Sequence, residues 1–148
     1  MTNFSRLDAR NAILTEVYSK LDTLDIDRIK EGELAIYAEN SPKLDLDEHK
    51  YVIEITIDFE DTQQIEVNPN PSVRTSGTIS FVVGVREGGG SIVPLTISDF
   101  IHQNFRRLWL GKVRTTTPRD VGPSYGLRAW NFRRIDVPFR FDAKDFVN

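Results

Sequence analysis

The residue types that most often carry out chemistry are sparse in this chain. The two histidines, His49 and His102, lie far apart in the sequence, and there are no cysteines. The acidic run Asp45–Glu48 lacks the glycine and the distal glutamate of a calcium-binding loop. The glycine-rich segment Glu87–Gly90 lacks the lysine that completes a phosphate-binding loop. The sequence therefore predicts no catalytic residue, no metal site and no cofactor, and the chain is not expected to be an enzyme.

The clearest candidate for a binding surface is a basic segment interleaved with aromatic residues. Residues Arg106–Arg134 contain eight lysines and arginines but one acidic residue, Asp120. Arginine and aromatic side chains are enriched at protein–protein interfaces, and they also form surfaces that bind single-stranded nucleic acid. An isoelectric point near 5.4 favours the protein interface, because an acidic protein repels phosphates. The predicted interface residues are Arg106, Arg107, Trp109, Arg114, Arg119, Tyr125, Arg128 and Trp130.

Charge is divided unequally along the chain, although the net charge is only −3. Residues 1–66 carry 16 acidic and 7 basic side chains, whereas residues 67–148 carry 6 acidic and 12 basic side chains. Two surfaces of opposite charge allow copies of a protein to pack head to tail. Two solvated faces without any partner explain the same distribution equally well.

Two helices are expected to position these residues. Ser5 and Asp8 have the spacing of a capping box, which predicts a helix over Ser5–Leu21. A second helix is predicted over Leu95–Leu110, with a cap from Thr96 or Ser98 and an end at Gly111. The apolar stripe of the first helix consists of Leu7, Ile13, Leu14, Val17, Tyr18 and Leu21.

The remaining elements are predicted to be strands joined by polar loops. Alternation of apolar and polar residues is clearest in Tyr51–Glu60. Pro138 has no amide hydrogen, so it predicts an edge or a bulge in the last strand. The order of elements predicts a single α+β domain over residues 1–148: a two-layer sandwich with a mainly antiparallel sheet and two principal helices packed on one face. The predicted strands are Glu33–Glu39, Tyr51–Glu60, Thr78–Arg86, Lys112–Thr117 and Leu127–Phe141, and the predicted loops are Asn40–His49, Glu87–Gly90 and Pro118–Tyr125.

The pattern of motifs along the chain resembles a known family. After the first helix and an acidic strand region comes the segment Ser76–Gly90, SGTISFVVGVREGGG, which is followed by the second helix. The chain then carries Pro123–Trp130, PSYGLRAW, and the strand Arg134–Phe141, RIDVPFRF. In length and element order it resembles the tail terminator, or tail completion, proteins of long-tailed bacteriophages, the family that includes the lambda tail terminator.

The resemblance implies a virion structural protein that forms a hexameric ring at the head-proximal end of the tail. Such a ring caps the tail tube, ends its polymerisation and presents a surface to the head–tail connector, or neck, protein. It implies as partners further copies of the chain, the tube protein and the neck protein, with DNA passing through the lumen without specific binding. Cofactors and membranes have no part in this role, and the expected location is the virion tail, with assembly in the host cytoplasm. The polar segment Met1–Arg10 is not expected to be a secretion signal.

Several residues are assigned within this interpretation, and two alternatives remain open. The acids Glu54, Asp58 and Glu60 are predicted to face the lumen of the ring. Another neck, connector or tube subunit would have a similar size and pattern. A nucleic-acid-binding module that uses the Arg106–Arg134 surface is the second alternative. The segments predicted to dock onto the tube or the neck are Asn68–Gly77, Glu87–Pro94 and Thr115–Tyr125.

Overall fold

The structure is a computed structural model that describes residues 4–26, 29, 32–38, 49–65, 67, 71–124 and 130–144. Within these residues the chain forms two helices and one sheet of seven strands. Strands β1, β2, β3, β7, β5 and β4 lie side by side in that order, and β6 also pairs with β7. In chain order the elements are α1 (Arg6–Leu21), β1 (Leu34–Ala38), β2 (Tyr51–Gln64), β3 (Ser72–Arg86), α2 (Ile92–Asn104), β4 (Trp109–Leu110), β5 (Val113–Thr115), β6 (Arg119–Ser124) and β7 (Trp130–Lys144).

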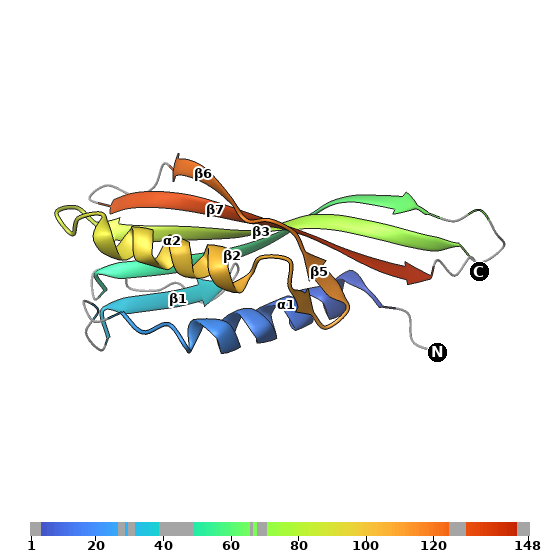
Figure 1. Cartoon of the computed structure of the whole chain (residues 1–148), viewed down its shortest axis with the longest axis horizontal. Helices are drawn as coiled ribbons and strands as arrows, with labels where there is room; N and C mark the ends of the chain where they lie inside the picture. Colours follow the sequence, from blue (N-terminus) through green and yellow to red (C-terminus); the bar gives the residue numbers. More distant parts are fainter. Residues whose placement is uncertain are drawn as a thin grey trace.

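The predicted two-layer sandwich is wrong. In the described part of the chain 50% of the residues are in strands and 25% in helices, and the sheet curls into a half-barrel. The curl follows from strand length, because β2, β3 and β7 contain 14 or 15 residues each and the twist of a strand accumulates along it. Figure 1 shows these three strands running the length of the molecule and twisting midway along it. Apolar alternation indicates which side chains are buried, but it does not indicate how far a sheet bends.

Both helices contribute to a core on the inside of this half-barrel. Apolar side chains from one face of β2, β3 and β7 join those of α1 and α2 in a single cluster. At its centre the ring of Phe81 on β3 lies 5.1 Å from the ring of Phe105, the residue that follows α2. The face of the sheet that contacts the helices is called the inner face here, and the opposite one the outer face.

The capping box predicted for the first helix is confirmed. The Ser5 hydroxyl accepts a hydrogen bond from the Asp8 amide at 3.1 Å, and the Asp8 carboxylate accepts one from the Ser5 amide at 2.9 Å. The buried stripe differs from the prediction in that Ala9 is buried, whereas the side chains of Leu7 and Tyr18 are 64% and 37% exposed. The residues of α1 that the core buries are Ala9, Ile13, Val17 and Leu21, which recur every four residues.

The second helix begins and ends earlier than predicted. It starts at Ile92, so that Pro94 falls in the first turn, where its missing amide hydrogen leaves no helical bond unmade. Thr96 does not cap the helix but donates its hydroxyl to the carbonyl oxygen of Ile92 at 2.7 Å. Residues Trp109–Leu110, predicted to be helical, instead form β4, and Gly111 lies in the turn between β4 and β5 with φ of 66°.

Three predicted strands are confirmed as β1, β2 and β3, with changed ends. β2 continues to Gln64, and β3 begins at Ser72, so Ser72–Gly77 is not the flexible docking segment that was predicted. β7 corresponds to the predicted last strand and extends to Lys144.

The predicted loop Pro118–Tyr125 is also wrong, because Arg119–Ser124 pairs with β7 as β6. A bulge between Asp120 and Gly122 accommodates the polar, glycine-containing sequence that indicated a loop. Pro138 lies within β7, where its carbonyl oxygen accepts a bond from the Thr116 amide at 2.9 Å. Thr116 belongs to the connection between β5 and β6. The missing amide hydrogen of Pro138 is therefore on the side of β7 where neither β5 nor β6 pairs with it.

Some predictions fall outside the described residues. These are the loop Asn40–His49 except for His49 itself, the segment Asn68–Asn70, the interface residues Tyr125 and Arg128, and the end of the chain after Lys144.

Gly77 on β3 provides a test of the packing that shapes the sheet. A Cβ atom at this position would contact the backbone oxygen of Asp58 and the ring of Phe139. We expect Gly77→Ala to destabilise the protein by about 1–3 kcal/mol, because backbone and ring must move apart. Chemical denaturation measures this change, with Ser76→Ala, on the outer face next to it, as the control. Equal stability of the two variants would contradict the proposed close packing.

Candidate interaction surface on the outer face of the sheet

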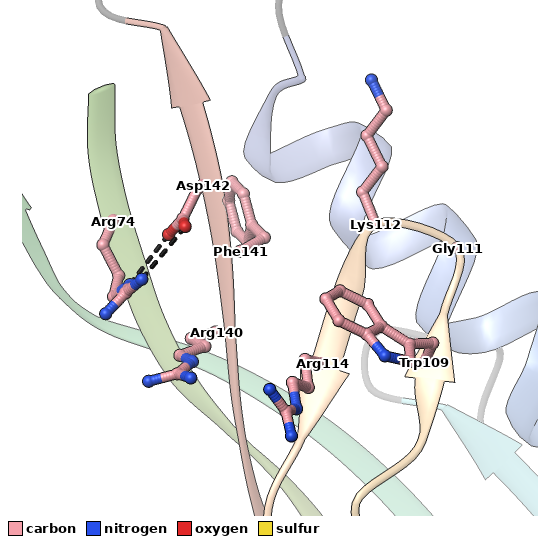
Figure 2. A pocket seen from close by; sticks show the side chains of 8 residues that line it. All are labelled: Arg74, Trp109, Gly111, Lys112, Arg114, Arg140, Phe141 and Asp142. Atoms are coloured by element: carbon pink, nitrogen blue, oxygen red, sulfur yellow. Dashed lines mark hydrogen bonds and ion pairs between the residues drawn. The ribbon is translucent and has the colours of Figure 1, made fainter. Parts of the chain in front are cut away.

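A hollow of about 500 Å³ lies on the sheet at the end where β5 pairs with β7 and β4 pairs with β5. Its floor is formed by the β4–β5 hairpin and by the last residues of β7, and Figure 2 shows its side chains. It combines two aromatic rings with four basic side chains and one carboxylate. The residues that line this basic groove are Arg74, Trp109, Gly111, Lys112, Arg114, Arg140, Phe141 and Asp142.

Strand register brings the charged residues of the basic groove together. Trp109 lies opposite Arg114 in the β4–β5 pair, and Arg114 lies opposite Arg140 in the β5–β7 pair. Arg140 in turn lies opposite Ser76, and Asp142 lies opposite Arg74. These residues therefore occupy the outer face, since inner-face positions alternate with them along each strand.

One carboxylate in the basic groove is already engaged. Arg74 donates two hydrogen bonds to Asp142, at 2.8 and 3.1 Å. The hydrogen bond from Arg74 lowers the pKa of Asp142 below its ordinary value; partial burial opposes this, and the charges of Arg74 and Arg140 reinforce it. Asp142 is thus ionised at neutral pH and oriented towards Arg74.

Arg114 and Arg140 differ from the other arginines of this face. Arg74 is paired with Asp142 at 2.8 Å and Arg134 with Asp136 at 2.8 Å. Within the described residues, the side chain of Arg140 has no hydrogen bond or ion pair.

The guanidinium of Arg114 lies 5.5 Å from the centre of the Trp109 ring, and Figure 2 shows it between Arg140 and Trp109. Like charges directly opposite on paired strands repel, so this cross-strand pair is destabilising unless an anion lies between them.

Trp109 and Lys112 complete the basic groove. Trp109 is 62% exposed, which is unusual for a large aromatic side chain. The Lys112 ammonium lies 5.6 Å from the centre of the Phe4 ring, so the start of the described chain borders the hairpin. The groove can therefore offer a carboxylate or phosphate two guanidinium groups and an aromatic surface.

The opposite edge of the same sheet is acidic. β1 pairs with β2 from Tyr51 to Ile55 only, so among the described strands β2 has one neighbour, β3, from Thr56 onwards. This acidic edge, residues Thr56–Gln64, carries Asp58, Glu60 and Asp61, all of them exposed. Glu60 accepts a hydrogen bond from the Thr78 hydroxyl, and the Asp61 carboxylate accepts one from the side-chain amide of Gln63 at 2.9 Å.

Glu54, the third acid predicted to line a lumen, has a local role in the sheet. Its carboxylate accepts a hydrogen bond from the Tyr37 hydroxyl at 2.8 Å. Burial, together with this bond and the charge of Glu54, raises the pKa of Tyr37 to about 12. The pair links β1 to β2, and the lumen-facing role of Glu54, Asp58 and Glu60 stays a prediction.

The structure separates the predicted interface residues into several places. Trp109 and Arg114 lie in the basic groove, together with Arg74 and Arg140, which the sequence analysis did not select. Arg106 and Arg107 are exposed in the turn after α2, where Arg107 has φ of 49°. The remaining described members lie elsewhere: Arg119 is 4.0 Å from Asp136, and Trp130 lies under Arg86 at 5.1 Å and stacks on Phe132 at 6.1 Å.

A second hollow, of about 870 Å³, lies between the glycine-rich turn, the start of α2 and the start of β7. It is more apolar than the basic groove, with Pro94, Trp130 and Phe132 among its lining residues. The part of the chain that the structure describes holds no group of three or more acidic or histidine side chains arranged to bind a metal. None of its helices is both long and apolar enough to cross a membrane.

Comparison of the sequence with known protein families and with curated protein sequences finds no match.

The Arg74–Asp142 pair provides a test of the electrostatics of the basic groove. We expect Arg74→Gln to raise the pKa of Asp142 towards the ordinary carboxyl value, because its main hydrogen-bond donor is lost. An NMR titration of the carboxyl carbons measures this pKa, with Arg106→Gln as a control. A depressed pKa gives stability that is present above the unfolded-state pKa and is lost as the pH falls through the folded-state pKa. In Arg74→Gln, the stability lost as the pH falls through the pKa of Asp142 should therefore be smaller. An unchanged pKa of Asp142 in this variant would show that Arg74 does not set it.

Proposed function

We propose that this chain is a structural subunit of a phage tail that assembles into a ring on the head-proximal end of the tail tube. The ring ends tube polymerisation and presents a surface for the head and neck proteins. The observation that carries the proposal is the opposite charge of the two edges of one sheet: the acidic edge on β2 and the basic groove beside β4 and β5.

A closed ring of identical subunits needs two different patches that fit each other. An interface that pairs a patch with itself closes after two copies, whereas a head-to-tail interface continues around a ring. Opposite charges at opposite edges favour the head-to-tail arrangement, since they oppose pairing of like edges. The sequence resemblance to tail terminator proteins supports the proposal that this ring lies on the tail tube.

A nucleic-acid-binding module is the second candidate, and one observation favours it. Exposed Trp109 lies beside basic side chains. In proteins that bind single-stranded nucleic acid, aromatic rings stack on bases and basic side chains contact phosphates. The net charge of −3 and the carboxylate of Asp142 within the groove oppose it. A gel-shift assay at low salt separates the candidates, because binding through phosphates weakens steeply as salt is raised.

Deleting the gene from its virus tests the proposed function. We expect overlong tails or tails without heads, because nothing would stop tube growth or attach the neck. Negative-stain electron microscopy of lysates measures tail length and head attachment, and expression of the chain from a plasmid provides the control. Tails of normal length that lack heads would instead indicate a neck or connector subunit and would contradict the terminator role.

A further inference from the structure

We infer that the basic groove of one copy receives the acidic edge of the next copy, so that the sheet continues from subunit to subunit. The inference rests on the proposed function, because it assigns the contact that would close the ring. The groove supplies Arg114, Arg140 and Trp109, and the neighbouring edge supplies Asp58 and Asp61. The occupant is therefore a second copy of this chain, presented as a strand with carboxylates along its outer face.

The two edges lie at the same level of the sheet. Asp61 is opposite Ser76, Ser76 is opposite Arg140, and Arg140 is opposite Arg114, which is opposite Trp109. This row crosses the sheet from the acidic edge to the basic groove. A neighbour that continues the sheet without sliding along its strands would place its own Asp61 beside Trp109 and Arg114.

The acidic edge of β2 favours pairing with a strand edge that carries basic side chains. From Thr56 to Gln63, among the described strands, β2 pairs on one side only, so backbone donors and acceptors on its other side have no strand partner. Exposed edges of this kind bind further strands unless charges prevent it. Here the carboxylates repel a second acidic edge, but they suit an edge that carries arginines.

The charges of the basic groove point to a carboxylate partner. Arg114 and Arg140 face each other, and the nearby Asp142 is already bonded to Arg74. A carboxylate from the neighbouring edge, placed beside Trp109, would lie near Arg114 and would offset its repulsion from Arg140 through charge-assisted hydrogen bonds. Arginine and tryptophan are also the residue types that contribute most to protein interfaces.

Charge reversal tests the contact. Arg114→Glu with Arg140→Glu gives a groove-reversed chain, and Asp58→Lys with Asp61→Lys gives an edge-reversed chain. Each alone is expected to lose self-association by more than about tenfold, because like charges would meet at the interface. An equimolar mixture should assemble again, because each reversed patch fits the matching patch of the other variant. Light scattering and negative-stain imaging measure assembly, and thermal unfolding checks that each variant is folded. The controls are Lys50→Glu and Glu16→Lys, which reverse the charge of exposed residues outside the two patches.

The absence of cysteine from the chain allows a second readout that leaves Arg114, Arg140, Asp58 and Asp61 unchanged. Gln63→Cys labels the acidic edge, and Lys112→Cys labels the β4–β5 hairpin within the basic groove. A mixture of the two variants, treated with a short bismaleimide, should give cross-linked dimers, whereas either variant alone should give far fewer. Both readouts are made on the chain alone and on the chain bound to tubes of the tail tube protein from the same virus.

The outcomes separate the inference from the proposed function. A groove-reversed chain that still assembles and caps tubes like the wild type would overturn the inference and leave the proposed function standing. Edge-to-groove cross-links and rescue by mixing, without any binding to tubes, would support the inference and reject the terminator role. Loss of DNA binding on groove reversal, with assembly unchanged, would assign the groove to nucleic acid and overturn the inference.

Discussion

The contact between Phe81 and Phe105 joins the sheet to the second helix, and the position of the basic groove depends on it. Both rings are fully buried, and their centres lie 5.1 Å apart. The Thr115 hydroxyl donates to the Phe105 carbonyl at 2.6 Å and accepts from the Leu108 amide at 2.8 Å. Since Thr115 belongs to β5, this buried polar contact holds the β4–β5 hairpin against the end of α2, where it carries Trp109 and Arg114 towards β7.

The outer face shows two ways of placing arginine on a sheet. The buried carboxylate of Asp136 accepts hydrogen bonds from Ser80 at 2.9 Å and from Arg134 at 2.8 Å, so this part of the face is satisfied within the chain. At the other end of β7, Arg140 faces Arg114 instead of an acid. Two arginines that face each other do not stabilise the folded chain, but in an assembly they can bind a carboxylate of a neighbouring subunit. The contrast between the two ends is the physical basis for assigning the contact to a partner.

Local signals in the sequence were sufficient for some elements and insufficient for the site. The Ser5–Asp8 capping box fixes where α1 begins, because both bonds form within one turn. β6 was missed because its pairing with β7 holds a sequence whose glycine and proline indicate a loop. Arg74 and Arg140 were missed because only the register of β3 and β7 brings them beside the hairpin. The basic segment contains Trp109 and Arg114, which line the basic groove, but sequence proximity could not separate them from Trp130 at the other end of β7.

The interruption at Pro138 has a mechanical consequence for the sheet. β5 and β6 pair with β7 on either side of this residue, and they do not pair with each other. On this side of β7 the sheet therefore divides into two branches, β5 with β4 and β6 alone, which form a fork that β7 joins. The hairpin is anchored to the core through β7 and through the bond from Thr115 to the end of α2, and it makes no ladder pair with β6. A partner that binds the hairpin is therefore held by the strand that also carries β6, and both branches reach the core through β7.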